Sequence, residues 1–197
     1  MASKRKYELK QRGEQLQETR RRITEATVEL HRTVGPAATR ISEVARRAGV
    51  QRLTVYNHFP DEASLFAACS EHWRALHPAP DPTPWLAIDD AGKRLRRALR
   101  ELYAWYRETE PMTANVLRDA DVLPALRPIV EGGLGAYLEH LRGILVEAFR
   151  ARGRRRARIE AAAKAAVDFH VWRALSSVGD RDAAELAADL VELAARK

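Results

Sequence analysis

The sequence predicts an all-α fold built in two parts. Apolar residues recur at helical spacing along most of the 197-residue chain, and the long runs of β-branched residues that strands favour are missing. Most of the nine prolines and ten glycines fall between the periodic segments, where they end one helix before the next begins. An apolar fraction of 46% is ordinary for a globular protein, so the chain can bury a sizeable core.

The most distinctive stretch is a pair of short predicted helices joined by a tight turn, ISEVARRAGVQRLTVYNHF (residues 41–59). Ala45 and Ala48 lie on one face of the first helix, and the small side chain of Ala45 lets the second helix cross closely. Gly49 follows at once, where the chain needs a residue that tolerates the left-handed conformation. Val55 anchors the second helix. This pattern is typical of a helix-turn-helix unit.

A further predicted helix lies on each side of this unit. The one before it has an apolar stripe formed by Ile23, Ala26, Thr27 and Leu30. This helix is expected to pack over the other two and complete a three-helix unit, and Gly35-Pro36 ends it. After the motif, Asp61 is a natural N-cap for another helix. Thr39 is expected to cap the first helix of the motif through its hydroxyl and to approach a phosphate.

The excess positive charge of the chain lies in its first part. Residues 1–60 hold 13 Lys and Arg against 6 Glu, whereas residues 61–197 hold 21 basic and 21 acidic side chains. The net charge of +7 therefore belongs to the segment with the helix-turn-helix pattern. A basic module attached to a neutral one is typical of a protein that binds a polyanion such as DNA. A solvated basic face without a partner is the alternative.

The outward face of the second helix suits DNA. It offers Arg52, Leu53, Tyr56 and Asn57, with His58 at its end. A guanidinium can donate two hydrogen bonds to guanine and an amide can pair with adenine, so Arg52 and Asn57 are the candidate base contacts. Leu53 has no hydrogen-bonding group and is expected to touch a thymine methyl or a sugar. Capping or packing is the alternative role for His58.

The segment AATRISEVARRAGVQRLTVYNHFPDEASLF (residues 37–66) resembles the DNA-binding core of the TetR family of transcriptional regulators. The A-x-x-A-G-V turn, the T-[apolar]-Y-x-H-F recognition helix and the Pro-led start of the next helix match in order and spacing. The resemblance implies that Tyr56 and His58 touch the DNA backbone and that Thr54 lies partly buried against the duplex. The predicted DNA-binding residues are Thr39, Arg40, Gln51, Arg52, Leu53, Thr54, Tyr56, Asn57 and His58.

Three positions depart from the family pattern. Gln51 stands where a small capping Ser or Thr is frequent, Leu53 where Gly is common, and Glu62 where a phosphate-binding Lys often lies. DNA binding remains the expected function. The departures affect which base sequence the second helix reads and how that helix docks on the DNA.

The predicted domains are a basic flexible arm over residues 1–19, a TetR-type helix-turn-helix domain over residues 20–76 and a helical domain over residues 77–197. The arm is expected to lie along the DNA backbone or in the minor groove, and a tail with no bound role is the alternative. Its cations are Lys4, Arg5, Lys6, Lys10 and Arg12. Beyond the proline-rich stretch HPAPDPTPW, with an interruption at Pro111, helices are expected over residues 89–107, 113–120, 124–151, 158–178 and 181–196.

The resemblance implies a homodimer and a small-molecule effector. The last two predicted helices are rich in alanine, and in this family they pair with those of a second subunit, so that two recognition helices reach a palindromic site. Packing within one chain is the alternative for these helices. The candidate lining of an effector pocket consists of Trp105, Met112, Asn115, Tyr137, His140, Phe169, His170 and Trp172. Ordinary core packing is the alternative for each of them.

Other classes of protein are disfavoured. The six histidines lack metal-ligand spacing, and neither a G-x-S-x-G elbow nor a phosphate-binding loop is present, so no enzyme, metal site or cofactor is predicted. The single cysteine, Cys69, excludes an intramolecular disulfide. Without a signal-peptide core or an apolar membrane span, the protein is expected in the cytoplasm. The expected function is a repressor released from DNA by a small ligand, with a ligand-free or architectural DNA-binding protein as the alternative.

Overall fold

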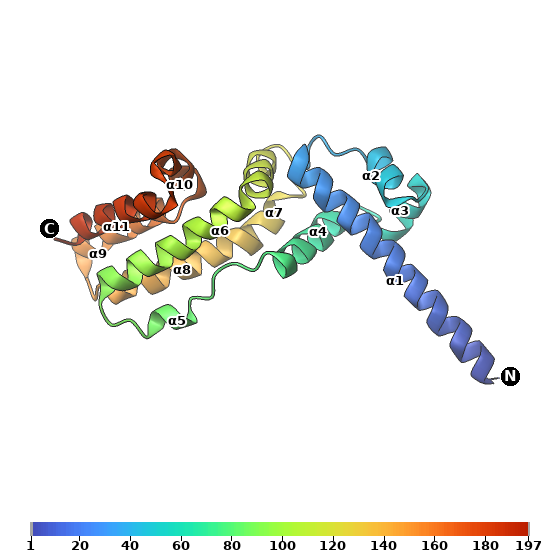
Figure 1. Cartoon of the computed structure of the whole chain (residues 1–197), viewed down its shortest axis with the longest axis horizontal. Helices are drawn as coiled ribbons and strands as arrows, with labels where there is room; N and C mark the ends of the chain where they lie inside the picture. The colour runs from blue at the N-terminus through green and yellow to red at the C-terminus, as the bar shows by residue number, and fades with distance from the viewer. Residues whose placement is uncertain (1, 197) are drawn as a thin grey trace. The chain divides into compact units, whose positions relative to one another are not determined.

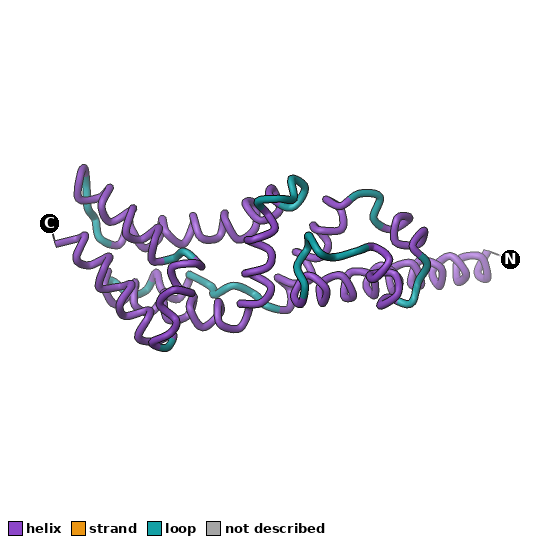
Figure 2. The backbone as a smooth tube through the Cα atoms, turned by 90° about the horizontal axis from the view of Figure 1, so that it is seen from above, coloured by secondary structure: helices purple, strands orange, loops and turns teal. Residues whose placement is uncertain are grey.

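The computed structural model describes the backbone of residues 2–196 and the side chains of residue 7 and residues 10–196. Within that part of the chain every regular element is a helix, as Figure 2 shows. The predicted all-α fold is therefore confirmed. The elements in order are α1 (Ala2–Thr33), α2 (Ile41–Ala48), α3 (Arg52–His58), α4 (Glu62–Leu76), α5 (Thr83–Leu86), α6 (Ala91–Ala120), α7 (Arg127–Val130), the π-helix η1 (Glu131–Gly135), α8 (Ala136–Ala148), α9 (Gly153–Ala166), α10 (Phe169–Leu175), the 3-10 helix η2 (Ser176–Val178) and α11 (Asp180–Arg196).

The chain divides into two compact units. The first unit comprises Met1–His77 and Pro111–Val130, and the second comprises Pro78–Glu110 and Glu131–Lys197. One division thus falls at the proline-rich stretch, and another falls inside α6, whose last part belongs to the first unit. The division inside α6 falls at Pro111, where the sequence predicts an interruption, and the helix itself continues through it.

The first unit is built around α1, which lies against α2 and α4 (Figure 1). The core residues of this unit are supplied by α1 to α4 and the segment that follows α3: Ile23, Leu30, Val44, Val55, Phe59, Leu65 and Cys69. The carboxylate of Asp61 caps α4, because it accepts a hydrogen bond from the backbone N–H of Ser64 at 2.7 Å. The structure therefore has the three helices of the predicted unit and the predicted cap of the fourth.

The last part of α6 closes the first unit against the end of α1. Met112 adds its side chain to the same core. The side-chain amide of Asn115 donates hydrogen bonds to the carbonyl oxygens of His31 and Arg32, each at 3.0 Å. Carbonyl groups in the last turn of a helix have no partner within that helix, so Asn115 supplies one to the end of α1.

The second unit contains a group of long helices in which α9 packs closely against α11 and α8 (Figure 1). Two tyrosines of α6 are buried there. The Tyr103 hydroxyl donates a hydrogen bond to the Ala166 carbonyl at 2.8 Å, and the Tyr106 hydroxyl donates one to the Val167 carbonyl at 2.6 Å. Burial raises the pKa of both phenols. The two tyrosines thereby satisfy carbonyl groups at the end of α9.

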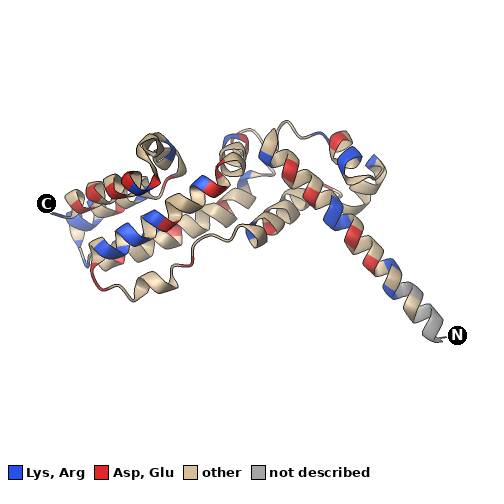
Figure 3. Cartoon of the chain, viewed as in Figure 1, with Lys and Arg blue, Asp and Glu red and all other residues tan. Residues whose placement is uncertain are grey.

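Charged side chains also connect α6 with α11, and Figure 3 shows Lys and Arg along α6 and acidic residues along α11. The Nη1 of Arg96 lies 3.1 Å from a carboxylate oxygen of Glu185, and its Nη2 lies 3.0 Å from a carboxylate oxygen of Glu192. Arg107 lies 3.0 Å from Asp180, at the start of α11. These pairs are partly buried, which makes them more effective than fully exposed ion pairs. Ionic contacts therefore help to hold α11 on α6.

Two helices are longer than the sequence predicts. The helix α1 begins at Ala2, so the segment expected as a flexible arm is part of α1. The helix α6 continues through Pro111, and the predicted interruption there is wrong. A proline inside a helix costs roughly 3 kcal/mol, because it removes an N–H donor and crowds the preceding turn. Burial of the apolar side chain of Met112 next to it contributes about 1.5–3 kcal/mol and offsets much of this cost.

Two predicted helices are divided. Residues 124–151 contain α7, η1 and α8, because the glycine-rich sequence EGGLG forms a π-helical turn in place of a regular one. Residues 158–178 contain most of α9, all of α10 and η2. The break falls at Asp168, whose carboxylate accepts hydrogen bonds from the N–H groups of His170 at 2.8 Å and Val171 at 3.1 Å. Aspartate is favoured at this capping position, so the break has a signal in the sequence.

Candidate nucleic-acid interface

The helix-turn-helix forms as the sequence predicts. At the end of α2, Gly49 has φ +65°, and backbone N–H groups of the turn bond back to the carbonyls of Ala45 and Arg46. A residue with a side chain is strained in this conformation, so glycine lets the chain turn sharply from α2 into α3. Val55, which is 1% exposed, then anchors α3 on the core.

The helix α3 presents its predicted outer face to solvent. All four outward residues are exposed: Arg52, Leu53, Tyr56 and Asn57. Leu53 is 66% exposed. Thr54 and His58 lie at the edge of this face and are half-buried. The face combines a guanidinium, an amide, a phenol and an apolar side chain, which together can contact base edges and phosphates.

The segment before α2 differs from the prediction at Thr39. The Thr39 hydroxyl donates a hydrogen bond to the Gly35 carbonyl at 2.8 Å, one turn earlier in the chain. Arg40 holds the N-cap position of α2 and Gln51 that of α3, and neither makes a side-chain capping bond. The prediction that Thr39 caps α2 is therefore wrong, because its hydroxyl bonds a carbonyl of the preceding loop instead.

Two arginines of α1 contact the helix-turn-helix directly, a role that the pattern of the sequence does not indicate. The Nη1 of Arg20 donates a hydrogen bond to the His58 carbonyl at 2.7 Å, and the guanidinium carbon lies 4.1 Å from the centre of the Phe59 ring. The Nη2 of Arg22 donates a hydrogen bond to the Gly49 carbonyl at 3.4 Å. The basic triplet that contains both is visible in the sequence, but which members face α3 depends on the rotation of α1.

The cations of the predicted arm are described only in part. Lys10 and Arg12 are exposed on α1. Lys4, Arg5 and Lys6 lie outside the described side chains. Contact between the arm and DNA therefore stays a prediction.

The predicted effector residues are not gathered in one place. Met112 and Asn115 belong to the first unit, where they contact its core and the end of α1. His140 on α8 and His170 on α10 are exposed. These four residues therefore do not share a buried pocket within the second unit.

The other four predicted effector residues are aromatic and belong to the second unit. Phe169 and Trp172 are buried, with ring centroids 5.3 Å apart. Trp105 and Tyr137 are half-buried, with ring centroids 6.4 Å apart, and the Tyr137 hydroxyl donates a hydrogen bond to the Pro80 carbonyl at 3.0 Å. Packing against one another accounts for this cluster, and ligand contact stays a prediction.

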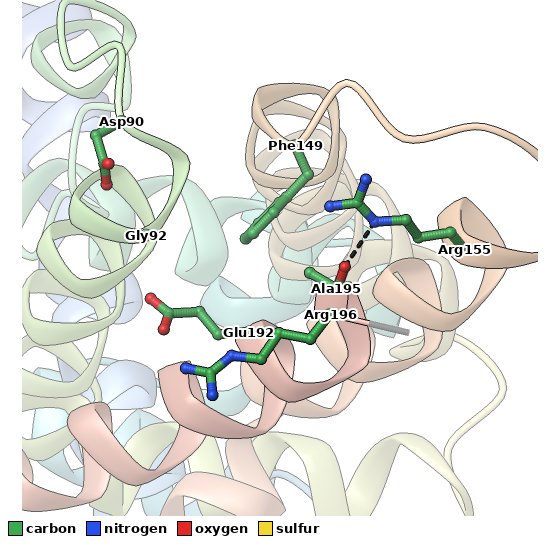
Figure 4. A pocket seen from close by; sticks show the side chains of 7 residues that line it. All are labelled: Asp90, Gly92, Phe149, Arg155, Glu192, Ala195 and Arg196. Carbon is green, nitrogen blue, oxygen red and sulfur yellow. Dashed lines mark hydrogen bonds between the residues drawn. The ribbon is translucent and has the colours of Figure 1, made fainter.

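A surface hollow of about 590 Å³ in the second unit has a different lining, shown in Figure 4. Its lining residues are Asp90, Gly92, Phe149, Arg155, Glu192, Ala195 and Arg196. The Nε of Arg155 donates a hydrogen bond to the Ala195 carbonyl at 2.6 Å on one side of this hollow (Figure 4). None of the eight predicted effector residues lines it. Its charged lining also differs from the apolar pocket that the sequence predicts.

Three other observations bear on the class of protein. Among the described side chains, no group of three His, Cys, Asp or Glu is placed to hold a metal ion. Burial raises the pKa of the Cys69 thiol to about 12, which disfavours the reactive thiolate. Within the described residues, each helix is too short or too polar to cross a membrane.

An exposed second helix behind a glycine turn, supported by a buried three-helix core, defines a helix-turn-helix protein. Residues 23–69, which contain this motif, match the family of bacterial regulatory proteins called the tetR family. This match identifies residues 23–69 as a DNA-binding domain of the TetR type.

Known proteins resemble the chain over different lengths. The HTH-type transcriptional repressor Rv3405c of Mycobacterium tuberculosis is 34% identical over 122 residues, which cover 59% of this chain and 63% of that protein. A TetR transcription regulator from Haloarcula marismortui has a TM-score of 0.59 at 16% identity, over 91% of this chain and 97% of that one. The structure of RolR with resorcinol has a TM-score of 0.52 at 18% identity, over 94% of this chain and 97% of the RolR chain. At such low identity, the two structures show a shared fold.

Proposed function

We propose that this protein is a transcriptional repressor that binds a palindromic DNA site in the cytoplasm as a homodimer. The observation that carries the proposal is the exposed face of α3, where Arg52 and Asn57 stand on a helix anchored by the buried Val55. A guanidinium and an amide at these positions suit guanine and adenine in the major groove. The sign of regulation is taken from the relative Rv3405c, which is described as a repressor.

An apolar stripe on α11 supports the homodimer. Leu186, Leu190 and Leu193 recur at spacings of four and three residues and are 47%, 58% and 54% exposed. The opposite side of α11 is buried within the chain through small residues such as Ala184 and Ala188. A helix with one buried side and a second, exposed apolar stripe favours a partner helix. A second α11 is the proposed partner, since a two-fold dimer brings two recognition helices to one palindromic site.

The proposed effector is a small organic molecule that binds the second unit. The support comes from RolR, whose structure holds resorcinol. The candidate binding region is the aromatic cluster of this unit, which contains Tyr106, Phe169 and Trp172. Aromatic walls are common in sites for small organic ligands. Ligand binding would release DNA if it favours a dimer in which the two recognition helices no longer match the spacing of the half-sites.

Selection of bound duplexes from a random pool tests the proposal most directly. We expect a symmetric consensus whose half-sites are separated by about one turn of DNA or a multiple of it. Recovery of duplexes without a shared sequence would instead identify an architectural DNA-binding protein. The effector is tested separately, by screening phenols and other aromatic metabolites for compounds that raise the melting temperature and weaken binding to the selected duplex. A regulator that binds its site and responds to none of them is a ligand-free repressor.

A further inference from the structure

We propose that Arg20 is a positioning residue for DNA recognition, which fixes the C-terminal end of α3 and hence the direction of the side chains that contact bases. The inference rests on the proposed function, since it assumes that α3 enters the major groove. It concerns a residue of α1 that lies outside the helix-turn-helix motif itself.

The recognition helix needs such support because it is very short. It spans seven residues, Arg52–His58, and an isolated helix of this length is unstable in water. Its orientation is therefore set by its neighbours. Among the helices of the first unit, α2 packs most closely on α3, and the turn at Gly49 holds the N-terminal end. Val55 fixes the middle of the helix. At the C-terminal end the chain continues into the buried Phe59, and Arg20 adds a second anchor there.

Arg20 supplies that anchor through two contacts of one guanidinium. Its Nη1 donates a hydrogen bond to the carbonyl of His58, the last residue of α3, at 2.7 Å. Its guanidinium carbon lies 4.1 Å from the centre of the Phe59 ring, which is 2% exposed and therefore held in place by the core. A cation near the last carbonyl groups of a helix also interacts favourably with the helix dipole.

The two contacts require a guanidinium in particular. Its planar face stacks on an aromatic ring while its edge donates hydrogen bonds, whereas the ammonium of lysine is a compact charge that cannot do both in one position. A base contact depends on hydrogen bonds whose strength falls steeply with misalignment. A small tilt of α3 therefore weakens binding to the correct site more than it weakens binding to unrelated DNA.

The neighbouring Arg21 is a matched control. It lies on the same helix, carries the same charge and is also exposed. Its guanidinium pairs with Glu18 at 2.7 Å and Glu25 at 2.5 Å, both on α1. Replacing either arginine by methionine removes one positive charge and keeps a long apolar side chain. Only the Arg20 substitution removes the contact with the end of α3.

The experiment compares the wild-type chain with Arg20→Met, Arg20→Lys and Arg21→Met. Affinity is measured for the duplex selected by the wild-type chain and for a random duplex, at several salt concentrations and well below each melting temperature. We expect Arg20→Met to lower the ratio of specific to random affinity by about tenfold, Arg20→Lys to lower it in part, and Arg21→Met to leave it unchanged. The salt slope should be the same for the two methionine variants. If Arg20→Met does not fold, the Arg20→Lys variant carries the comparison.

The other outcomes separate the alternatives. If the variants of Arg20 keep the wild-type ratio, the positioning role is wrong. If Arg20→Met weakens both duplexes equally and lowers the salt slope by about one relative to Arg21→Met, Arg20 contacts a phosphate instead. If the wild-type chain itself does not distinguish the selected duplex from random DNA, the proposed function fails, whatever the variants of Arg20 do.

Discussion

The carboxylate of Asp119 accepts a hydrogen bond at 2.9 Å from the backbone N–H of Ala37, which lies 82 positions earlier in the chain. Its other oxygen accepts a hydrogen bond from the guanidinium of Arg118 at 2.7 Å, and this contact raises the pKa of Arg118. The Asp119 side chain is only 4% exposed. The last turn of α6 therefore holds the loop that leads into α2, and with it the approach to the helix-turn-helix.

Removing this carboxylate should destabilise the first unit. Asp119→Ala leaves the Ala37 N–H and the Nε of Arg118 without this acceptor, and the expected loss in the free energy of unfolding is about 1–3 kcal/mol. Asp121→Ala is the control, because that side chain is 85% exposed and should change stability by less than about 0.5 kcal/mol. Urea unfolding of both variants measures the difference, and equal midpoints would show that the Asp119 contact is unimportant.

Glycine substitutions at two positions should have opposite effects. Gly35 has φ +92°, and a Cβ there would collide with Arg118 and Asp119, so Gly35→Ala should lower stability by at least about 1 kcal/mol. Gly13 lies within α1, and a Cβ added there would meet nothing within 4 Å, so Gly13→Ala should raise helix stability by up to about 1 kcal/mol. Thermal unfolding followed by circular dichroism measures both changes. A stabilised Gly35→Ala variant would contradict the geometry of this loop.

Stability should fall in mild acid because of His31. Burial lowers the pKa of His31 to about 4, and the nearby charge of Asp119 offsets only part of this effect. The unfolded chain binds a proton at His31 below about pH 6.5, whereas the folded chain does so only near pH 4. The free energy of unfolding therefore decreases by up to about 3 kcal/mol as the pH falls from 6.5 to about 4.

A substitution at His31 isolates this contribution. In His31→Leu, the dependence of the urea midpoint on pH between 6.5 and 4 should become flatter, whatever the stability at neutral pH. His140→Leu, at an exposed position on α8, should retain the wild-type dependence. A wild-type slope in His31→Leu would assign the acid sensitivity to other groups.

The proposed dimer predicts a charge-sensitive surface on α11. Leu190→Glu places a carboxylate in the middle of the exposed stripe, where a partner helix would bury it, and should convert the dimer to a monomer. Leu86→Glu is the matched control, since Leu86 is 52% exposed on α5 and lies outside the stripe. Analytical ultracentrifugation distinguishes the two states. A dimeric Leu190→Glu variant would place the interface elsewhere.

The proposed base contact at Arg52 predicts a local loss of specificity. Arg52→Ala should weaken binding to the selected duplex by about 1–3 kcal/mol and blur the discrimination at one base pair. Tyr56→Phe, which removes an expected phosphate contact, should weaken all duplexes similarly. Gel-shift titrations with single-base variants of the selected duplex separate these effects. Unchanged binding in both variants would rule out the proposed docking of α3.

The helix-turn-helix was predictable because its signals are local. The spacing of Val44, Ala45 and Ala48 identifies the buried face of α2, and all three are buried in the structure. Gly49 marks the turn and Asp61 marks the start of α4, because both act through backbone groups a few positions away. Such signals specify where a helix begins, where it ends and which of its faces is apolar.

Other elements depend on contacts that local patterns do not carry. Pro111 is unfavourable in a helix by itself, yet α6 passes through it because the flanking residues are buried. The sequence predicts effector residues from side-chain type alone, and the structure places these residues in both units, some of them exposed. Residue type alone does not tell which side chains meet across the fold.

Periodicity, turn residues and charge are properties of short segments, so the helical class, the recognition helix and the concentration of positive charge near it follow from the amino-acid sequence. The contact of Arg20 with the end of α3 and the contact of Asp119 with the Ala37 backbone are seen only in the folded chain. Those two contacts join residues 38 and 82 positions apart. They exist because helix packing brings distant side chains within hydrogen-bonding distance, and no local pattern encodes that distance.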